Sequence, residues 1–256
     1  MQSNIKIYLY VLVLTGVTAA LLSFLYNALD PIQTKNKEDA KKRSILSSIP
    51  DVKGDVDFDK KVMIALLDSK GKTLFEQGTD SKKEDIEKIL SGLNKRGEGV
   101  KYTKLIDVDL ALEEKFPQDK RVYPVYSYTN DNGNTVRVVS VRGNGLWDKI
   151  WGYVALGFVE NKWTLLGVNF DHKAETPGLG AEIKDSKDFK DQFKGKSIFD
   201  ETGNYVSVSV VKAPKDKYHE VKSISGATVT SVGVSDMMIK GISNYLPYLE
   251  SKTEKK

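Results

Sequence analysis

The sequence predicts an α+β domain on a mostly antiparallel sheet, preceded by a single N-terminal transmembrane helix. Three observations support this class: an uncharged apolar run near the N-terminus, a series of hairpin signals after residue 50, and helical spacing of apolar residues near the C-terminus. Because hairpins dominate and helices are interspersed among them, the sheet is expected to be mostly antiparallel. The chain has 256 residues, 40% of them hydrophobic, which is enough to bury the core of one or two domains.

Residues 1–30 are predicted to anchor the chain in a membrane. The run from Ile7 to Leu29 contains no charged residue. As a helix it would be roughly 34 Å long, enough to cross a hydrocarbon core of about 30 Å. The run is longer than the apolar part of a signal peptide, and no small-x-small cleavage site follows it. We therefore expect an uncleaved anchor, with a cleaved signal peptide as the alternative.

Residues 31–50 are predicted to form a charged, helical juxtamembrane stalk. Basic residues gather in it, at Lys35, Lys37, Lys41, Lys42 and Arg43. By the positive-inside rule this bias would place the large domain in the cytoplasm, but long domains can be translocated regardless of such a bias. A solvated helix face is the simpler interpretation of these charges, and lipid head groups are an alternative partner.

Residues 51–250 are predicted to form the folded domain, and residues 251–256 a disordered tail. Antiparallel pairs are expected around three turns, at residues 69–72, at Asn132-Gly133 and at Glu160-Asn161. A further strand is expected over Tyr205–Val211.

Three helices are predicted in this domain. A capping box at Ser81–Glu84 would open the first, which runs to about Asn94 and has Ile86, Ile89, Leu90 and Leu93 on one face. The second covers residues 186–193. The third begins at about Ser231 and buries a stripe made of Val234, Met238, Ile242, Tyr245 and Leu249.

Composition excludes several classes of chemistry. There is no cysteine, which excludes disulfides, thiolate metal sites, iron–sulfur clusters and cysteine nucleophiles. Only two histidines occur, and the acidic stretches 55–59 and 107–114 lack the spacing of a calcium loop, so no metal site is predicted. The net charge of +4 is too small to indicate nucleic-acid binding. Redox chemistry would therefore require an organic cofactor.

Two segments differ from ordinary scaffolding. The first runs from His172 to Gly180 and ends in Thr176-Pro177-Gly178-Leu179-Gly180, where proline fixes φ and the glycines permit close approach of the backbone to another group. A tight turn between strand and helix is the alternative interpretation. The second runs from Ser223 to Ser231, into the last predicted helix. Its hydroxyl groups surround a Gly-Ala pair where free N–H groups favour a phosphate, whereas a structural cap would need one hydroxyl.

These segments resemble the FMN-binding domains of bacterial membrane redox pumps. The residues Ser225–Ser231 are similar to the flavinylation motif of that family, and Glu175–Gly180, with His172 before it, is similar to its second flavin loop. Gly145-Leu146-Trp147 and the stalk beginning Pro31-Ile32-Gln33 narrow the resemblance to the family of the C subunit of the sodium-translocating NADH:quinone oxidoreductase. The resemblance covers nearly the whole chain.

The resemblance implies one FMN, joined by a phosphoester bond to Thr228 by a separate flavin transferase. It implies that Ser225, Thr230 and Ser231 donate to the phosphate, that Leu179 packs on the isoalloxazine ring and that Thr176 binds a polar edge. Leu146 and Trp147 would shield another side, although Trp147 could equally be a core residue. The full set of implied cofactor-binding residues is Ser225, Gly226, Ala227, Thr230, Ser231, Glu175, Thr176, Gly178, Leu179, Gly180, Leu146 and Trp147.

The resemblance also implies a cellular role. The chain would relay electrons inside a multi-subunit complex of the bacterial cytoplasmic membrane, with its large domain on the periplasmic side. It would have no catalytic residue of its own and would not bind NADH, for which it lacks a Gly-x-Gly-x-x-Gly fingerprint.

One position departs from the family pattern, and other functions stay open. Lys222 stands where the family usually has an Asp, six residues before the modified Thr, so FMN could be bound without a covalent bond or be absent. The alternatives are the G subunit of the related ion-translocating ferredoxin:NAD oxidoreductase, a non-redox anchored binding module, and an enzyme acting alone.

Overall fold

The computed structural model describes all residues except 1, 51, 53–55, 79–80, 98 and 254–256. The chain divides into two compact units, Met1–Lys42 and Arg43–Lys256. Helix α1 (Gln2–Ser47) accounts for the described part of the first unit and contains Pro31. It is long and apolar enough to cross a membrane, with a mean hydropathy of 2.1 in its most apolar window. The predicted anchor and stalk therefore form one continuous helix, which ends three residues before the predicted boundary at residue 50.

Two hydroxyl groups within the apolar run make hydrogen bonds inside the helix. The Thr15 hydroxyl donates to the carbonyl of Val11 at 2.9 Å, and the Thr18 hydroxyl donates to the carbonyl of Leu14 at 3.0 Å. A polar group in lipid needs an internal partner, because there is no water to bind it. These threonines are therefore compatible with the interior of a bilayer.

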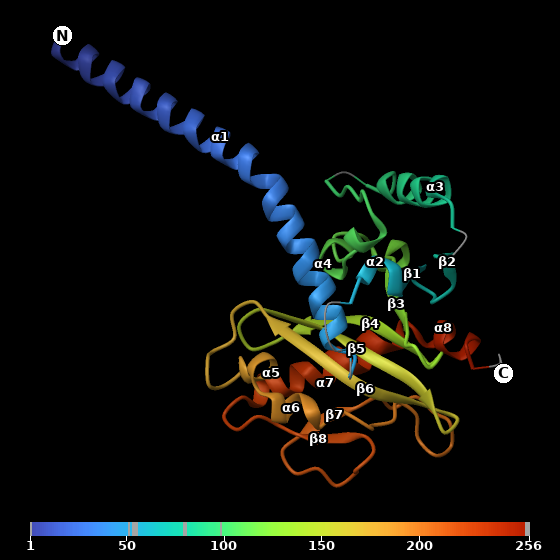
Figure 1. Cartoon of the computed structure of the whole chain (residues 1–256). Coiled ribbons are helices and arrows are strands. Elements are labelled where there is room, and N and C mark those ends of the chain that lie inside the picture. The colour runs from blue at the N-terminus through green and yellow to red at the C-terminus, as the bar shows by residue number, and fades with distance from the viewer. Residues whose placement is uncertain (1, 51, 53–55, 79–80, 98, 254–256) are drawn as a thin grey trace. The chain divides into compact units, whose positions relative to one another are not determined.

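The second unit is built on a six-stranded antiparallel sheet with the order β2-β1-β3-β4-β5-β6 (Figure 1). Its strands are β1 (Val62–Leu67), β2 (Thr73–Glu76), β3 (Tyr123–Thr129), β4 (Thr135–Asn144), β5 (Lys149–Val159) and β6 (Lys162–His172). A two-stranded parallel sheet pairs β7 (Ser209–Val211) with β8 (Glu220–Lys222). The prediction of an α+β fold on a mostly antiparallel sheet is confirmed.

All three predicted hairpins are present, and the one between β5 and β6 turns at the predicted pair. Between β5 and β6, Glu160 and Asn161 have φ of 48° and 62°, as a two-residue hairpin turn requires. Between β3 and β4 the loop is longer than the predicted two-residue turn. The Asn130 side chain closes it by accepting from the amides of Asn132 and Asn134, at 3.0 and 2.9 Å.

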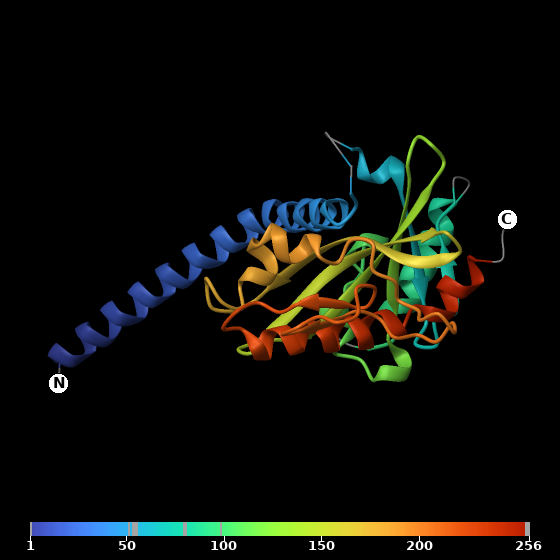
Figure 2. The same ribbon diagram turned by 90° about the horizontal axis from the view of Figure 1, so that it is seen from below.

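The sheet buries side chains on both faces, because successive residues of a strand point to opposite sides. On β4, Val139 and Val141 belong to one cluster of the core, and Val136 and Val138 belong to the other. Figures 1 and 2 show α7 lying along one face of the sheet. The remaining helices are α2 (Phe58–Lys61), α3 (Lys83–Asn94), α4 (Leu110–Glu113), α5 (Glu182–Asp185), α6 (Lys187–Asp191), α7 (Thr228–Ser243) and α8 (Leu246–Ser251), with 3₁₀ turns at Leu105–Asp107 and Gln118–Lys120.

The C-terminal helix confirms the predicted apolar stripe but not its extent. Its five predicted core residues are fully buried: Val234, Met238, Ile242, Tyr245 and Leu249. The helix begins at Thr228, three residues before the predicted start, and it is interrupted after Ser243. Ser251 lies in α8, and the Lys252 ammonium lies 2.8 Å from the Glu76 carboxylate. The predicted disordered tail is therefore ordered through this residue, and residues 254–256 lie outside the described part.

Two other local predictions were wrong. Ser81 does not cap α3: its hydroxyl accepts from the Gly78 amide at 2.7 Å, and Lys82 occupies the N-cap position without a side-chain hydrogen bond. The predicted strand from Tyr205 to Val211 is reduced to β7. Ser207 has a φ of 60°, which is incompatible with an extended strand.

A buried ion pair fastens the end of α3 to α4. The Glu113 carboxylate accepts from both terminal nitrogens of Arg96, at 2.6 and 2.9 Å, from the Tyr102 hydroxyl at 2.6 Å and from the Val122 amide at 2.7 Å. Burial, and then the neighbouring Glu113 carboxylate, raise the pKa of Tyr102. The carboxylate is fully buried and has partners for both oxygens, so it serves as a structural clamp.

Candidate functional site

Glu175 brings three loops together. One carboxylate oxygen accepts from the Trp147 amide at 3.0 Å, and the other accepts from the Thr230 hydroxyl at 2.5 Å. Trp147 belongs to the turn between β4 and β5, and Thr230 to the first turn of α7. The Glu175 amide donates to the His172 ring at 3.1 Å. The side chain is buried, with 4% of its surface exposed, so Glu175 holds the loops in place from beneath.

The loop after β6 folds into a tight turn over α7. The Thr176 carbonyl accepts from the amides of Leu179 and Ala181, both at 3.1 Å. A Cβ atom at Gly180 would lie 2.7 Å from the Thr230 hydroxyl oxygen. Glycine is therefore required where this turn packs against the helix. The Trp147 indole N–H donates to the Thr176 hydroxyl at 3.1 Å. This bond joins the turn between β4 and β5 to the loop after β6.

Helix α7 begins without a capping side chain. Ala227 occupies the N-cap position, and the first bond of the helix runs from the Ser231 amide to the Ala227 carbonyl at 2.9 Å. Within the described residues, the amides of Thr228, Val229 and Thr230 have no hydrogen-bond acceptor. Thr228 is the first helical residue and is exposed. An exposed hydroxyl thus lies beside free N–H groups and the positive end of the helix dipole.

The glycine before this helix is required by its backbone. Gly226 has a φ of 77°, which other residues rarely adopt, and a Cβ atom there would lie 2.7 Å from a Leu179 methyl carbon. The loop after β6 therefore lies directly against the start of α7. The glycine of the Gly-Ala pair is thus explained by its backbone conformation and by close packing.

Exposed apolar side chains are carried by the same three segments. They are Leu146, Trp147, Leu179, Val229 and Val232. The Trp147 side chain is 67% exposed, which excludes the alternative of a core role for it. Isolated exposed apolar residues are common, but these lie on segments that Glu175 connects, and together they could contact a planar apolar ligand. Sequence reasoning missed Val229 and Val232, because both precede the buried stripe of the helix.

Three of the residues expected to contact the cofactor have side chains that are buried in the protein: Thr230, Ser231 and Glu175. Thr230 and Ser231 are buried, each with 1% exposure, and the Ser231 hydroxyl oxygen accepts from the Ile224 amide at 3.3 Å. Their hydroxyl groups therefore serve the protein interior, as does the carboxylate of Glu175. Among the residues expected at the phosphate, Ser225 and Thr228 are exposed. Lys222 is exposed on β8, and its amide donates to the Gln192 side chain at 2.7 Å.

The residues present fit FMN chemically. A phosphate ester at Thr228 would be stabilised by the free amides at the start of α7, to which no side chain of the described residues is hydrogen-bonded. The exposed apolar residues offer a surface to a flavin ring, and the Thr176 hydroxyl can still donate its proton after accepting from Trp147. The site therefore suits a ligand with a phosphate at one end and a flat apolar ring at the other.

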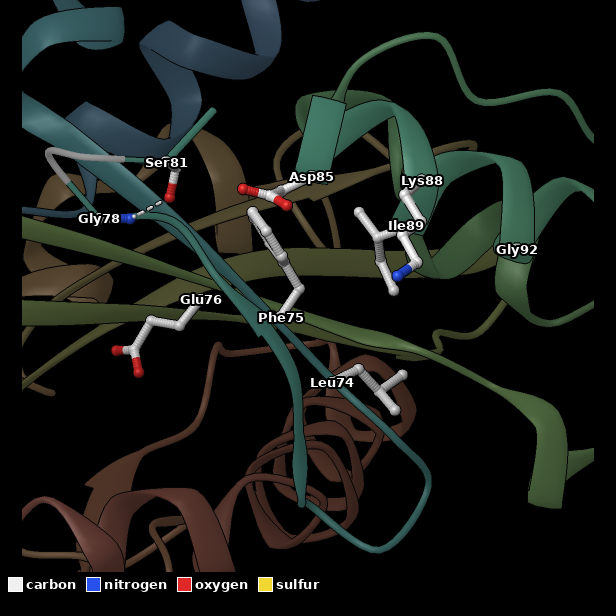
Figure 3. Close-up of a pocket in the computed structure, with 9 residues that line it drawn as sticks. All are labelled: Leu74, Phe75, Glu76, Gly78, Ser81, Asp85, Lys88, Ile89 and Gly92. Carbon is white, nitrogen blue, oxygen red and sulfur yellow. Dashed lines mark hydrogen bonds between the residues drawn. The ribbon is translucent and has the colours of Figure 1, made fainter. Parts of the chain in front are cut away.

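A separate surface pocket of the domain is not part of this site. About 710 Å³ in volume, it lies between β2 and α3 (Figure 3). The Phe75 ring extends toward Asp85 and Ile89, whereas the Glu76 carboxylate points away. Glu76 already accepts from Lys252 and from the Tyr248 hydroxyl. The residues that resemble flavin motifs do not line it.

Comparisons with known proteins agree with the geometry. A family model described as an FMN-binding domain matches residues 145–243, which contain all three loops. The C subunit of the Na(+)-translocating NADH-quinone reductase of Pseudomonas aeruginosa is 30% identical over 247 residues, covering 93% of this chain and 90% of that protein. The protein of the same name from Neisseria meningitidis is 35% identical over 128 residues, covering 49% of this chain and 48% of its own length.

Two solved structures share the fold. The crystal structure of the protein of that name from Parabacteroides distasonis has a TM-score of 0.62 at 26% identity, covering 89% of this chain and 98% of that one. The structure named NqrC from Shewanella oneidensis has a TM-score of 0.62 at 24% identity, covering 85% of this chain and 99% of that one.

The fold and the site define a membrane-anchored flavoprotein with an FMN-binding domain. The match to the Pseudomonas protein, which covers most of both chains, narrows this class to one family. The chain belongs to the family of the C subunit of the Na(+)-translocating NADH-quinone reductase.

Proposed function

We propose that this chain is the electron-carrying subunit of a membrane complex that couples oxidation of NADH by a quinone to sodium transport, and that it carries one FMN joined to Thr228 by a phosphoester bond. The main support is the position of Thr228, an exposed hydroxyl at the uncapped start of α7. The names of its relatives supply the reaction and the partner subunits. The bound flavin would accept and release electrons, and the protein would supply its binding and orientation.

The protein's residues would position the flavin and control access to it. The amides of Thr228–Thr230 would stabilise the phosphate. Glu175 would hold the loops that contact the ring, and the exposed apolar side chains around them would leave one edge accessible to an electron donor or acceptor. Thr228 is then an attachment point and not a nucleophile, so it needs no neighbouring general base. NADH would bind to another subunit, because this sequence has no dinucleotide fingerprint.

A flavin transferase would make the phosphoester bond on the outer side of the membrane. That requirement of the family is the reason to place the large domain in the periplasm, although the basic residues of α1 favour the opposite orientation. Lys222 bears on the same reaction, because an Asp is usual at this position. FMN would still be attached in the presence of Lys222 if the transferase recognises mainly the Ser225–Thr228 segment and the start of α7.

The test is to co-express the full chain with a flavin transferase, purify it in detergent and measure its intact mass and its in-gel flavin fluorescence after denaturation. We expect a fluorescent band with the added mass of one FMN, and loss of both in Thr228→Ala. Thr202→Ala is the matched control, since it removes an exposed threonine hydroxyl outside the proposed site and should keep the added mass. Lys222→Asp should attach FMN at least as completely as the natural chain.

Two results would contradict the proposal. A chain that gains no mass in either the natural form or Lys222→Asp would rule out covalent attachment. Release of free FMN on denaturation would then show non-covalent binding, and a colourless protein would favour a non-redox anchored module. Unchanged fluorescence in Thr228→Ala would place the bond on another residue.

A further inference from the structure

A second cavity lies on the sheet beside α4, with a volume of about 360 Å³. Its floor is formed by two cross-strand pairs of β4 and β5, Ser140 with Tyr153 and Arg142 with Trp151. The segment Asp109–Ala111, at the start of α4, forms the opposing wall. None of the residues proposed to bind FMN lines this cavity. Its volume is within the range of small-molecule sites, which is about 300–1,000 Å³.

Arg142 is held in one orientation at the cavity. Its Nε donates to the Glu114 carboxylate at 3.0 Å, and its guanidinium carbon lies 5.6 Å from the centroid of the Trp151 ring. Only 16% of the side chain is exposed. Its two terminal nitrogens make no hydrogen bond within the part of the chain that the structure describes. An arginine fixed at Nε and stacked on an aromatic ring presents these nitrogens as a preformed fork, which matches the two oxygens of an oxyanion.

The charges around the cavity limit the charge of the ligand. Lys173 also lines it and pairs with Asp148 at 2.9 Å, just as Arg142 pairs with Glu114. Asp109 adds a negative charge to the wall. Lys149 also lies 3.5 Å from the Glu114 carboxylate, so Arg142, Lys149 and Lys173 are balanced by three carboxylates. A monovalent carboxylate would need only the free fork of Arg142, whereas a divalent phosphate would bring a second negative charge that these cations do not offset.

The rest of the lining is apolar or aromatic. Leu110 and Ala111 cover one side, and the rings of Trp151 and Tyr153 lie in the floor. A planar ring attached to the carboxylate would bury its faces between these groups. We propose that this cavity is a binding site for small aromatic monocarboxylates, with the ligand carboxylate on the terminal nitrogens of Arg142 and its ring against Leu110 and Tyr153. The proposal does not depend on FMN attachment.

Calorimetric titration of the full, flavin-free chain in detergent tests this, with benzoate as the probe and benzamide as its uncharged isostere. We expect saturable binding of one benzoate and at least about tenfold weaker binding of benzamide, since the charged interaction with Arg142 would be lost. Arg142→Gln should weaken benzoate binding by about tenfold to hundredfold. Arg142→Lys keeps the charge without the fork and should lie between the two.

Two further variants separate the site from general effects on the fold. Arg137→Gln is the matched control, because Arg137 lies on the same strand with its guanidinium carbon 5.4 Å from the Trp163 ring centroid, and it does not line the cavity. It should bind benzoate like the natural chain. Ala111→Trp fills the cavity from its exposed wall while keeping the Arg142 side chain, and should abolish binding. The proposal is overturned if benzoate does not bind, if benzamide binds equally well, or if Ala111→Trp binds normally.

Discussion

The Thr230 hydroxyl and the Glu175 carboxylate, 55 residues apart in the chain, share a 2.5 Å hydrogen bond in the protein interior. The same carboxylate accepts from the Trp147 amide, so one buried side chain connects the β4–β5 turn, the loop after β6 and the start of α7. The exposed Thr228 and the apolar side chains beside it therefore rest on a rigid support. This arrangement allows the outer surface to remain open to a ligand.

Glu175→Gln should destabilise this support. Glutamine has the same shape, and its oxygen can still accept from the Trp147 amide. Its amino group can only donate to the Thr230 hydroxyl oxygen, so the buried hydroxyl proton loses its charged acceptor. We expect a loss of about 1–3 kcal/mol in the free energy of unfolding, measured by chemical denaturation. Glu201→Gln, at an exposed position, is the control and should change stability little. Equal stability of the two variants would contradict the structural role given to Glu175.

Two glycine-to-alanine changes should have opposite effects. At Gly180 the new methyl group would lie against the Glu175 carboxylate and 2.7 Å from the Thr230 hydroxyl oxygen, so we expect a loss of about 1–3 kcal/mol. At Gly92, inside α3, nothing lies within 4 Å of the new atom. Alanine should stabilise that helix by about 0.5–1 kcal/mol. Thermal unfolding of both variants checks the signs, and a stabilised Gly180→Ala would show that the loop does not pack on α7 as described.

Glu113→Gln should be among the most damaging single changes. It leaves the Arg96 guanidinium, whose side chain is 15% exposed, without its charged partner. Breaking a buried pair in this way costs about 3–5 kcal/mol. Glu87→Gln breaks an exposed pair with Lys83 and should stay within about 0.5 kcal/mol of the natural chain. Denaturant unfolding gives the free energy of unfolding of both variants. Similar small losses in the two would contradict the structural role given to Glu113.

Tyr205 should make stability fall in strong base. Burial raises its pKa from 10.0 to about 12, and its hydroxyl donates to the Ile239 carbonyl at 2.7 Å. Between these two values the unfolded chain releases the proton while the folded chain keeps it, so the free energy of unfolding decreases as pH rises from 10.0 to about 12. Tyr205→Phe should remove this part of the decline. A tyrosinate difference spectrum between the two proteins checks the pKa, and titration near 10.0 would contradict it.

Local signals in the sequence were sufficient for much of the fold. The apolar run of α1, the left-handed pair Glu160-Asn161 and the buried stripe of α7 each follow from residues close together in the chain. Predictions were wrong where the predicted hydrogen-bonding group was bonded to a different partner nearby. Ser81 was expected to cap a helix, but its hydroxyl is taken by the Gly78 amide.

For the site, the sequence by itself determined the identity of the segments, because glycine positions and a hydroxyl at a helix start are local requirements. Only the tertiary structure decided which of their side chains face outward. Thr228 and Thr230 are two residues apart, yet the first is exposed and the second is buried on Glu175. That difference depends on where the β6 loop meets α7, and the free energy that fixes it comes from a hydrogen bond between residues distant in sequence. The cavity at Arg142 has the same origin, since its wall and floor meet only when α4 packs on β4 and β5.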